Sequence, residues 1–152
     1  MEIPLSTDAA KVVRMTARAF GAFGREIAEA TYARLAADSE ARAEISEATM
    51  RRARHPEQFD GEMMALALHI DQLDRVSNVL DQIARRHVQD GFKPEHYRHV
   101  EKALLPAIRD VLGEGASDQV LDAWREGFIY LSGLLISRAQ ELSRSRPSAK
   151  AA

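Results

Sequence analysis

The sequence predicts an all-α fold, and three features of the chain support this prediction. Apolar residues recur every three or four positions along nearly the whole chain, the spacing that places side chains on one face of a helix. No segment alternates apolar and polar residues as a half-buried strand does. Finally, Pro56 and Pro94 stand where helical patterns begin, and Gly91 and Gly113 stand where such patterns end.

The first third of the chain predicts two closely spaced helices. The first begins after Ser6, a suitable capping residue, and carries Val12, Val13 and Phe20 on one side. Gly21 and Gly24 then interrupt the pattern. No strand precedes this glycine pair, so we interpret it as a close helix crossing and not as a phosphate-binding loop. The second helix runs to about residues 37–39, and its apolar residues include Phe23, Ile27 and Leu35.

A short polar segment at residues 40–54 separates these helices from a longer one. The longer helix begins at Pro56, which suits the first turn of a helix because proline has no amide hydrogen to leave unpaired. Its apolar residues repeat every three or four positions and are Phe59, Met63, Leu66, Ala67 and Ile70.

Three more helices are expected in the second half. One covers residues 74–90 and places His87 on its buried face, because the spacing from Val76 through Leu80 and Ile83 to His87 is four, three and four. The next runs from Pro94 to Gly113. The last begins after Ser117 and fades at about Leu142. We therefore expect one domain over residues 1–142 and a disordered polar tail over residues 143–152.

Composition excludes several classes of function. The 21 basic and 23 acidic residues give a net charge of −2, so the chain has no overall attraction to nucleic acid or to acidic membranes. No cysteine is present, which excludes disulfides, thiolate nucleophiles and iron–sulfur ligation. No leader pattern and no run of about 20 apolar residues occurs, so a cytoplasmic location is expected.

Histidines are the main candidates for chemistry. His96 and His99 are three residues apart, but no third ligand accompanies them, and we expect both to be solvated. His87 differs because it lies on a buried stripe and Tyr97, ten residues later, could orient its imidazole. The spacing alone leaves two interpretations of His87 open, a core histidine or a metal ligand.

A resemblance decides between them. Residues 83–128 resemble the region from the proximal-histidine helix into the last helix of bacterial haemoglobins and of flavohaemoglobin haem domains. The motif combines His87, Gly91, the His96-Tyr97 pair, the apolar pattern of residues 104–113 and the Ala123-Trp124 pair. The resemblance extends more weakly over residues 7–142. It implies a globin fold with a haem pocket between distal and proximal helices, and the absence of cysteine implies that haem b is held non-covalently.

The resemblance also implies the site residues. His87 would be the proximal iron ligand and Tyr97 its hydrogen-bonding partner. On the distal side, Tyr32 and His55 would contact bound gas, and Phe59 would line the pocket. The alternative for Tyr32 and Phe59 is that they are ordinary core aromatics, since such stripes occur in any helical core.

Two positions depart from the family pattern. Ile45 aligns with a phenylalanine that usually packs against the haem, so we expect a weaker haem contact there. Ala139 aligns with a glutamate that joins the proximal histidine and tyrosine in flavohaemoglobins. Glu141 cannot replace that glutamate, because two residues turn a helix by about 200°.

These implications favour reversible binding of a diatomic gas, namely oxygen, nitric oxide or carbon monoxide, for transport, storage or sensing. One alternative is nitric oxide dioxygenation, for which a separate reductase would be needed because no flavin or nicotinamide module follows residue 142. Another is a haem-free globin that serves in signalling. A homodimer is also compatible with the sequence.

Overall fold

The computed structural model describes residues 5–53 and 56–144, without the side chains of residues 52–60. Within these ranges the chain forms α-helices joined by short turns and contains no strand. The helices are α1 (Thr7–Ala22), α2 (Gly24–Ala37), α3 (Ser39–Glu44), α4 (Glu47–Ala53), α5 (Pro56–Leu68), α6 (Ser77–Asp90), α7 (Tyr97–Leu112) and α8 (Asp118–Arg144). The predicted all-α fold is confirmed. None of the described helices is long and apolar enough to cross a membrane.

The polar segment that follows α2 is more ordered than the sequence indicates, because it forms the short helices α3 and α4. Side-chain caps explain both. The Asp38 carboxylate accepts the Glu40 amide at 3.0 Å at the start of α3, and the Ser46 hydroxyl accepts the Thr49 amide at 3.1 Å at the start of α4. Such caps satisfy amides that a short helix leaves without partners.

The boundaries around α6 and α7 are also modified by short 3₁₀ turns. The helix expected from Asp74 begins at Ser77 after a turn over Leu73–Val76, and the helix expected from Pro94 begins at Tyr97 after a turn over Pro94–His96. Tight 3₁₀ turns are frequent at helix ends. Gly91 and Gly113 have positive φ angles of 80° and 58°, as expected of helix terminators.

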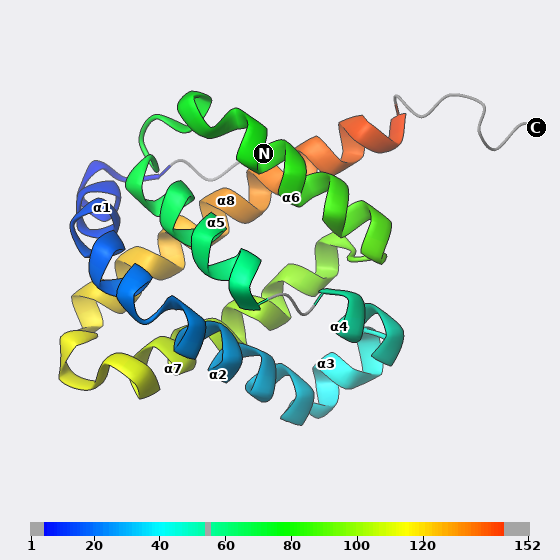
Figure 1. The fold of residues 1–152 in the computed structure, drawn as a ribbon, viewed down its shortest axis with the longest axis horizontal. Coiled ribbons are helices and arrows are strands. Elements are labelled where there is room, and N and C mark those ends of the chain that lie inside the picture. Colours follow the sequence, from blue (N-terminus) through cyan, green and yellow to red (C-terminus); the bar gives the residue numbers. More distant parts are fainter. Residues whose placement is uncertain (1–4, 54–55, 145–152) are drawn as a thin grey trace, which may run out of the picture.

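The long helices cross one another around one apolar core (Figure 1). Helix α1 packs against α5 and α8, α2 against α5 and α7, and α6 against α8. Trp124 of α8 stacks on Phe20 of α1 with ring centroids 4.0 Å apart, and its indole donates to the Thr16 hydroxyl at 2.8 Å. A Cβ atom on Gly21 would lie 2.6 Å from the Met64 sulfur, so this glycine marks a close helix crossing.

This packing leaves one side of the core open to a pocket. The short helices α3 and α4 form a corner beside α6 and α7 in Figure 1. A second, smaller apolar cluster joins this corner to α2 and α7 through Leu35, Ala41, Ile45 and Ala103. The walls of the pocket therefore come from helices that are far apart in the sequence.

Candidate functional site

A cavity of about 130 Å³ lies between α2, the α3–α4 corner, α5, α6, α7 and α8. Aliphatic and aromatic side chains form much of its wall. The polar residues among its lining come from several helices and are Thr31, Tyr32, Thr49, Glu62, Arg86, His87, Asp90, Tyr97 and Ser132. An apolar cavity with a few converging polar groups is typical of a site that binds an organic ligand or cofactor.

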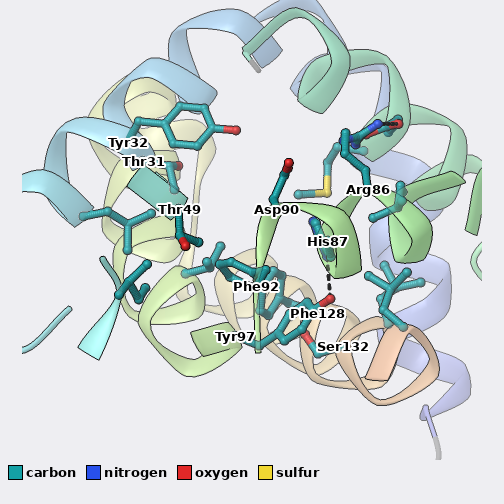
Figure 2. Close-up of a pocket in the computed structure, with 18 of the residues that line it drawn as sticks. Thr31, Tyr32, Thr49, Arg86, His87, Asp90, Phe92, Tyr97, Phe128 and Ser132 are labelled. Atoms are coloured by element: carbon teal, nitrogen blue, oxygen red, sulfur yellow. Dashed lines mark hydrogen bonds and ion pairs between the residues drawn. The ribbon is translucent and has the colours of Figure 1, made fainter. Parts of the chain in front are cut away.

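His87 enters this cavity from the last turns of α6. It follows Leu80 and Ile83, both buried, along the face that α6 turns toward the core. Its Nδ1 atom lies 2.6 Å from the Tyr97 hydroxyl, the hydrogen bond drawn in Figure 2. Burial, with a smaller contribution from the Arg86 guanidinium, lowers the pKa of His87 to about 4. The imidazole is therefore neutral at physiological pH.

Tyr97 reaches His87 from the start of α7. It is 8% exposed, and burial raises the pKa of its phenol well above the ordinary value. Tyr97 therefore stays protonated and keeps its hydroxyl available for the hydrogen bond. Sequence spacing predicts this pairing, and the structure brings the two side chains together.

The end of α6 adds a third aromatic residue that sequence reasoning missed. Gly91 in the left-handed conformation turns the chain back, so that the Phe92 amide donates to the His87 carbonyl at 2.8 Å and the Gly91 amide donates to Val88 at 3.2 Å. This pair of bonds is a Schellman motif, in which the residue after the glycine folds back on the helix. Phe92 accordingly packs on His87 and Tyr97, each with ring centroids 5.0 Å apart. The signal was present in the sequence, because an apolar residue follows the helix-ending glycine.

Tyr32 lies on the other side of the pocket. Figure 2 shows its ring extending from α2 toward the space above Asp90, across the pocket from His87. The neighbouring Thr31 also lines the pocket, but its hydroxyl donates to the Ile27 carbonyl at 2.7 Å within α2. Tyr32 is thus the residue of α2 that brings a phenolic hydroxyl to the wall.

Ile45 closes the corner of the pocket. It follows α3 directly, is 2% exposed and lines the cavity together with Met50 of α4. The structure therefore brings together four of the residues singled out from the sequence, Tyr32, Ile45, His87 and Tyr97. His55 and the side chain of Phe59 lie outside the described residues.

The pocket lining also contains a salt bridge between α6 and α5, which the sequence did not indicate. Arg86, next to His87 on α6, makes a two-pronged salt bridge with Glu62 of α5, and one of its bonds measures 3.0 Å. Both side chains are at most a quarter exposed and line the cavity. Partial burial and paired hydrogen bonds favour this interaction over an ordinary surface ion pair.

The expectation that His96 and His99 are solvated is wrong. They are 4% and 2% exposed, because the chain folds the end of α3 over the start of α7 and covers both rings. His99 Nε2 lies 2.7 Å from the Glu44 carboxylate. Among the described residues, no group of three or more histidines and acidic residues is arranged to hold a metal ion.

Among the described residues, no carboxylate hydrogen-bonds His87 or Tyr97. Helix α8 contributes Phe128, Leu131, Ser132 and Leu135 to the pocket wall. Ala139 follows one turn after Leu135 and is half-buried, whereas Glu141 is exposed. Neither His87 nor Tyr97 hydrogen-bonds a described acidic side chain.

Comparison of the sequence with known proteins found a matching family and similar proteins. The sequence profile of the globin family matches residues 39–133. A flavohemoprotein of Xylella fastidiosa (strain 9a5c) is 33% identical over 138 residues, which cover 91% of this chain and 35% of that protein. The chain thus spans about a third of the length of that relative.

Two solved structures share the fold. An engineered carbene transferase, described as a putative nitric oxide dioxygenase from Rhodothermus marinus, superposes with a TM-score of 0.81 at 23% identity, covering 93% of this chain and 98% of that one. A flavohemoglobin from Malassezia yamatoensis, solved with bound FAD and haem, gives a TM-score of 0.71 at 22% identity and covers 92% of this chain and 38% of that one.

Proposed function

This chain belongs to the globin family, and on that premise we propose that it holds one b-type haem non-covalently, with His87 as the axial ligand to the iron, and binds a diatomic gas reversibly. The observation that supports this most is the state of His87: a half-buried, neutral imidazole at the wall of an apolar cavity, with Nδ1 already engaged by Tyr97. A solved structure of similar fold has bound haem.

The residues present fit such a group. A neutral imidazole nitrogen is a suitable axial ligand for iron, and Nε2 is the ring nitrogen that the Tyr97 bond leaves available. The apolar lining suits the face of a macrocycle, and the sequence has no cysteine for covalent attachment. When bound, the haem iron supplies a coordination position for a gas such as oxygen, nitric oxide or carbon monoxide.

Each side chain then has a defined task. With Nε2 directed at the iron, the proton of His87 resides on Nδ1 and is donated to the Tyr97 oxygen, which fixes the tautomer and the ring plane. Phe92 packs against both rings and limits their rotation. Tyr32 offers a hydroxyl on the other side of the pocket, where a hydrogen-bond donor stabilises negative charge on a polar ligand.

The axial assignment is tested by His87→Ala. We expect the purified wild-type chain to show a Soret absorption band and one haem per chain, and the variant to lose most of its haem. His69→Ala is the matched control, because His69 is a half-buried histidine that does not line the pocket. Unchanged haem content in His87→Ala would refute the assignment, and a wild-type chain without a Soret band would support a haem-free signalling role instead.

The gas side is tested by Tyr32→Phe, which removes one hydroxyl and little volume. If Tyr32 stabilises bound oxygen, oxygen dissociation in stopped flow should accelerate about 2- to 10-fold, the effect of one hydrogen bond. Tyr130→Phe on α8, outside the pocket, should leave the rate unchanged. Equal rates in all three proteins would remove Tyr32 from the proposed binding site.

A second candidate function is nitric oxide dioxygenation together with a separate reductase. The similarity of this sequence to flavohemoproteins, and of this fold to that of a putative nitric oxide dioxygenase, supports this candidate. The chemistry would use the same pocket and the same His87, so the two proposals differ in electron supply and not in the binding site.

A further inference from the structure

Two histidines that the proposed haem site does not use hold the corner of the pocket. Helix α3 ends at Glu44, whose carboxylate lies against α7: one oxygen is 2.7 Å from His99 Nε2, and the other accepts from Arg98 at 2.8 Å. His99 is 2% exposed, while Arg98 lies on the surface. Glu44 thus connects a buried ring to a surface guanidinium.

His96 is the second buried histidine beside Glu44. Its Nδ1 accepts the Lys93 amide at 3.0 Å, which requires the ring proton to be on Nε2. The backbone carbonyl of Glu44 faces the same ring and favours its protonated form. We call Glu44, His96 and His99 the Glu44 clamp.

The clamp sits next to two residues of the pocket. On one side, Ile45 follows Glu44 directly and forms the corner wall. On the other, Tyr97 lies between the two histidines in the sequence and hydrogen-bonds His87. One turn of α7 therefore sets the position of both the corner and the His87 partner.

The α3–α4 corner requires an attachment to α7 because the short helix α3 has little stability of its own. Helix α3 has six residues, too few to be stable in isolation. Apart from Glu44, its polar links to α7 pass through Lys102, which is 62% exposed and pairs with Asp38 at 3.5 Å and with Glu40 at 3.9 Å. Exposed pairs of this kind contribute little, so the hydrogen bond between Glu44 and buried His99 provides the stronger attachment.

We propose that the Glu44 clamp is a positioning device that holds Ile45 in the pocket wall and thereby slows loss of the cofactor. This inference rests on the proposed haem-binding function. Its residues touch neither the cofactor nor the gas, and they act through the placement of Ile45.

The test uses Glu44→Ala and Glu44→Gln in the full chain loaded with haem. Transfer of ferric haem to an excess of apomyoglobin should be about tenfold faster in Glu44→Ala, the effect of losing one charge-assisted hydrogen bond to a buried group. Glu44→Gln should recover most of the wild-type rate, because its amide oxygen can still accept from His99. Arg34→Ala, which breaks an exposed ion pair between α2 and α7, is the control and should behave as wild type.

Two further measurements separate positioning from general loss of stability. The Ile45 amide donates to the Ala41 carbonyl at 2.7 Å, so its hydrogen exchange should accelerate in Glu44→Ala while exchange of the core residue Leu104 does not. In addition, Glu44→Ala should have little further effect on haem loss in an Ile45→Ala background.

Unchanged haem loss and unchanged Ile45 exchange in Glu44→Ala would overturn the inference, and so would equal acceleration at Ile45 and Leu104. If the wild-type chain takes up no haem, the proposed function fails. The exchange measurement on that chain then still decides whether the clamp holds Ile45.

Discussion

At the scale of single residues, the two nitrogens of the His87 ring have different surroundings. Nδ1 hydrogen-bonds the Tyr97 hydroxyl, and Nε2 is the nitrogen that we propose binds the iron. Partners of this kind set the tautomer of a ligating histidine and its basicity. The strength of the His87–Tyr97 bond should therefore be visible in the properties of the bound cofactor.

Replacing Tyr97 with phenylalanine tests this directly. The variant keeps the ring that packs on Phe92 and removes the hydroxyl that pairs with Nδ1. We expect a lower iron–histidine stretching frequency in resonance Raman spectra of the ferrous protein, and haem loss about 2- to 10-fold faster. Tyr130→Phe is the control. A frequency identical to that of the wild type would show that the hydroxyl does not influence the ligand.

The Glu44 clamp predicts a pH dependence of stability. Burial lowers the pKa of His96 below 6.5, against the opposing effects of Glu95 and the Glu44 carbonyl. Near pH 6.5 the His96 ring therefore takes up a proton in the unfolded chain but stays neutral in the folded chain. The free energy of unfolding consequently falls as the pH drops below 6.5. The His99 hydrogen bond lowers the pKa of Glu44, whose contribution is lost at still lower pH.

Urea unfolding of the purified protein between pH 5 and 8 measures this. His96→Gln should lose less stability than the wild type between pH 6.5 and 5, because it lacks the titrating ring. Other groups, including His87, titrate in both proteins and cancel in the comparison. Parallel pH profiles would mean that His96 does not contribute.

Sequence reasoning predicted residues whose partners are close in the chain better than those whose partners are distant. The pairing of His87 with Tyr97 spans ten residues and could be expected from helix spacing. The burial of His99 could not, because its partner Glu44 lies 55 residues away and belongs to a helix that the pattern did not reveal. Phe92 was overlooked because it lies outside the periodic segments.

At the scale of helices, the end of α6 determines how the chain returns to the pocket. Gly91 adopts φ 80° and ψ 20°, and the turn it makes places Phe92 on His87. A residue with a Cβ atom is strained in this left-handed conformation.

Gly91→Ala should therefore lower the free energy of unfolding by about 1 kcal/mol or more. It should also accelerate haem loss, because Phe92 shifts with the turn. Gly115→Ala is the matched control: no described atom lies within 4 Å of its added Cβ, and its backbone is not left-handed. Equal midpoints of urea unfolding for the two variants would contradict this role of Gly91.

The long helices could be predicted because their apolar stripes are complete in the sequence. The stripes of α6 and α8 place Leu80, Ile83 and Leu135 in the core, as the structure confirms. Helices α3 and α4 depend on the caps Asp38 and Ser46 and on contacts with other helices, α7 for α3 and α6 for α4, so apolar periodicity does not reveal them. The sequence consequently indicated only a short polar segment there.

At the scale of the whole molecule, the described helices pack around an apolar core, and the cavity that holds His87 lies beside it. The described residues contain no strand, and hence no strand-to-helix turn of the type that binds nicotinamide dinucleotides. Among the described residues, His87 and Tyr97 also lack a carboxylate partner, and such a partner would increase the basicity of a histidine that ligates iron.

We therefore expect the 152-residue chain alone to consume nitric oxide slowly. Consumption can be followed with a nitric oxide electrode in the presence of NADH and free flavin, with and without an added flavin reductase. The reductase should raise the steady rate, because the described residues contain no strand-to-helix turn of the type that binds nicotinamide dinucleotides. Fast sustained consumption without the reductase would refute this prediction.

Trp124 gives the protein a built-in optical reporter. It is the single tryptophan of the chain and is 5% exposed. Met63, Phe128 and Leu131 line both the main pocket and a small cavity beside Trp124, so the indole lies close to the main pocket. A strongly absorbing group bound there would quench indole fluorescence by energy transfer. Titration of the haem-free chain with haemin should thus reduce the emission in proportion to occupancy, and unfolding should restore the emission as the haem is released. Loading and release could then be timed in the unmodified protein, with no label and no substitution.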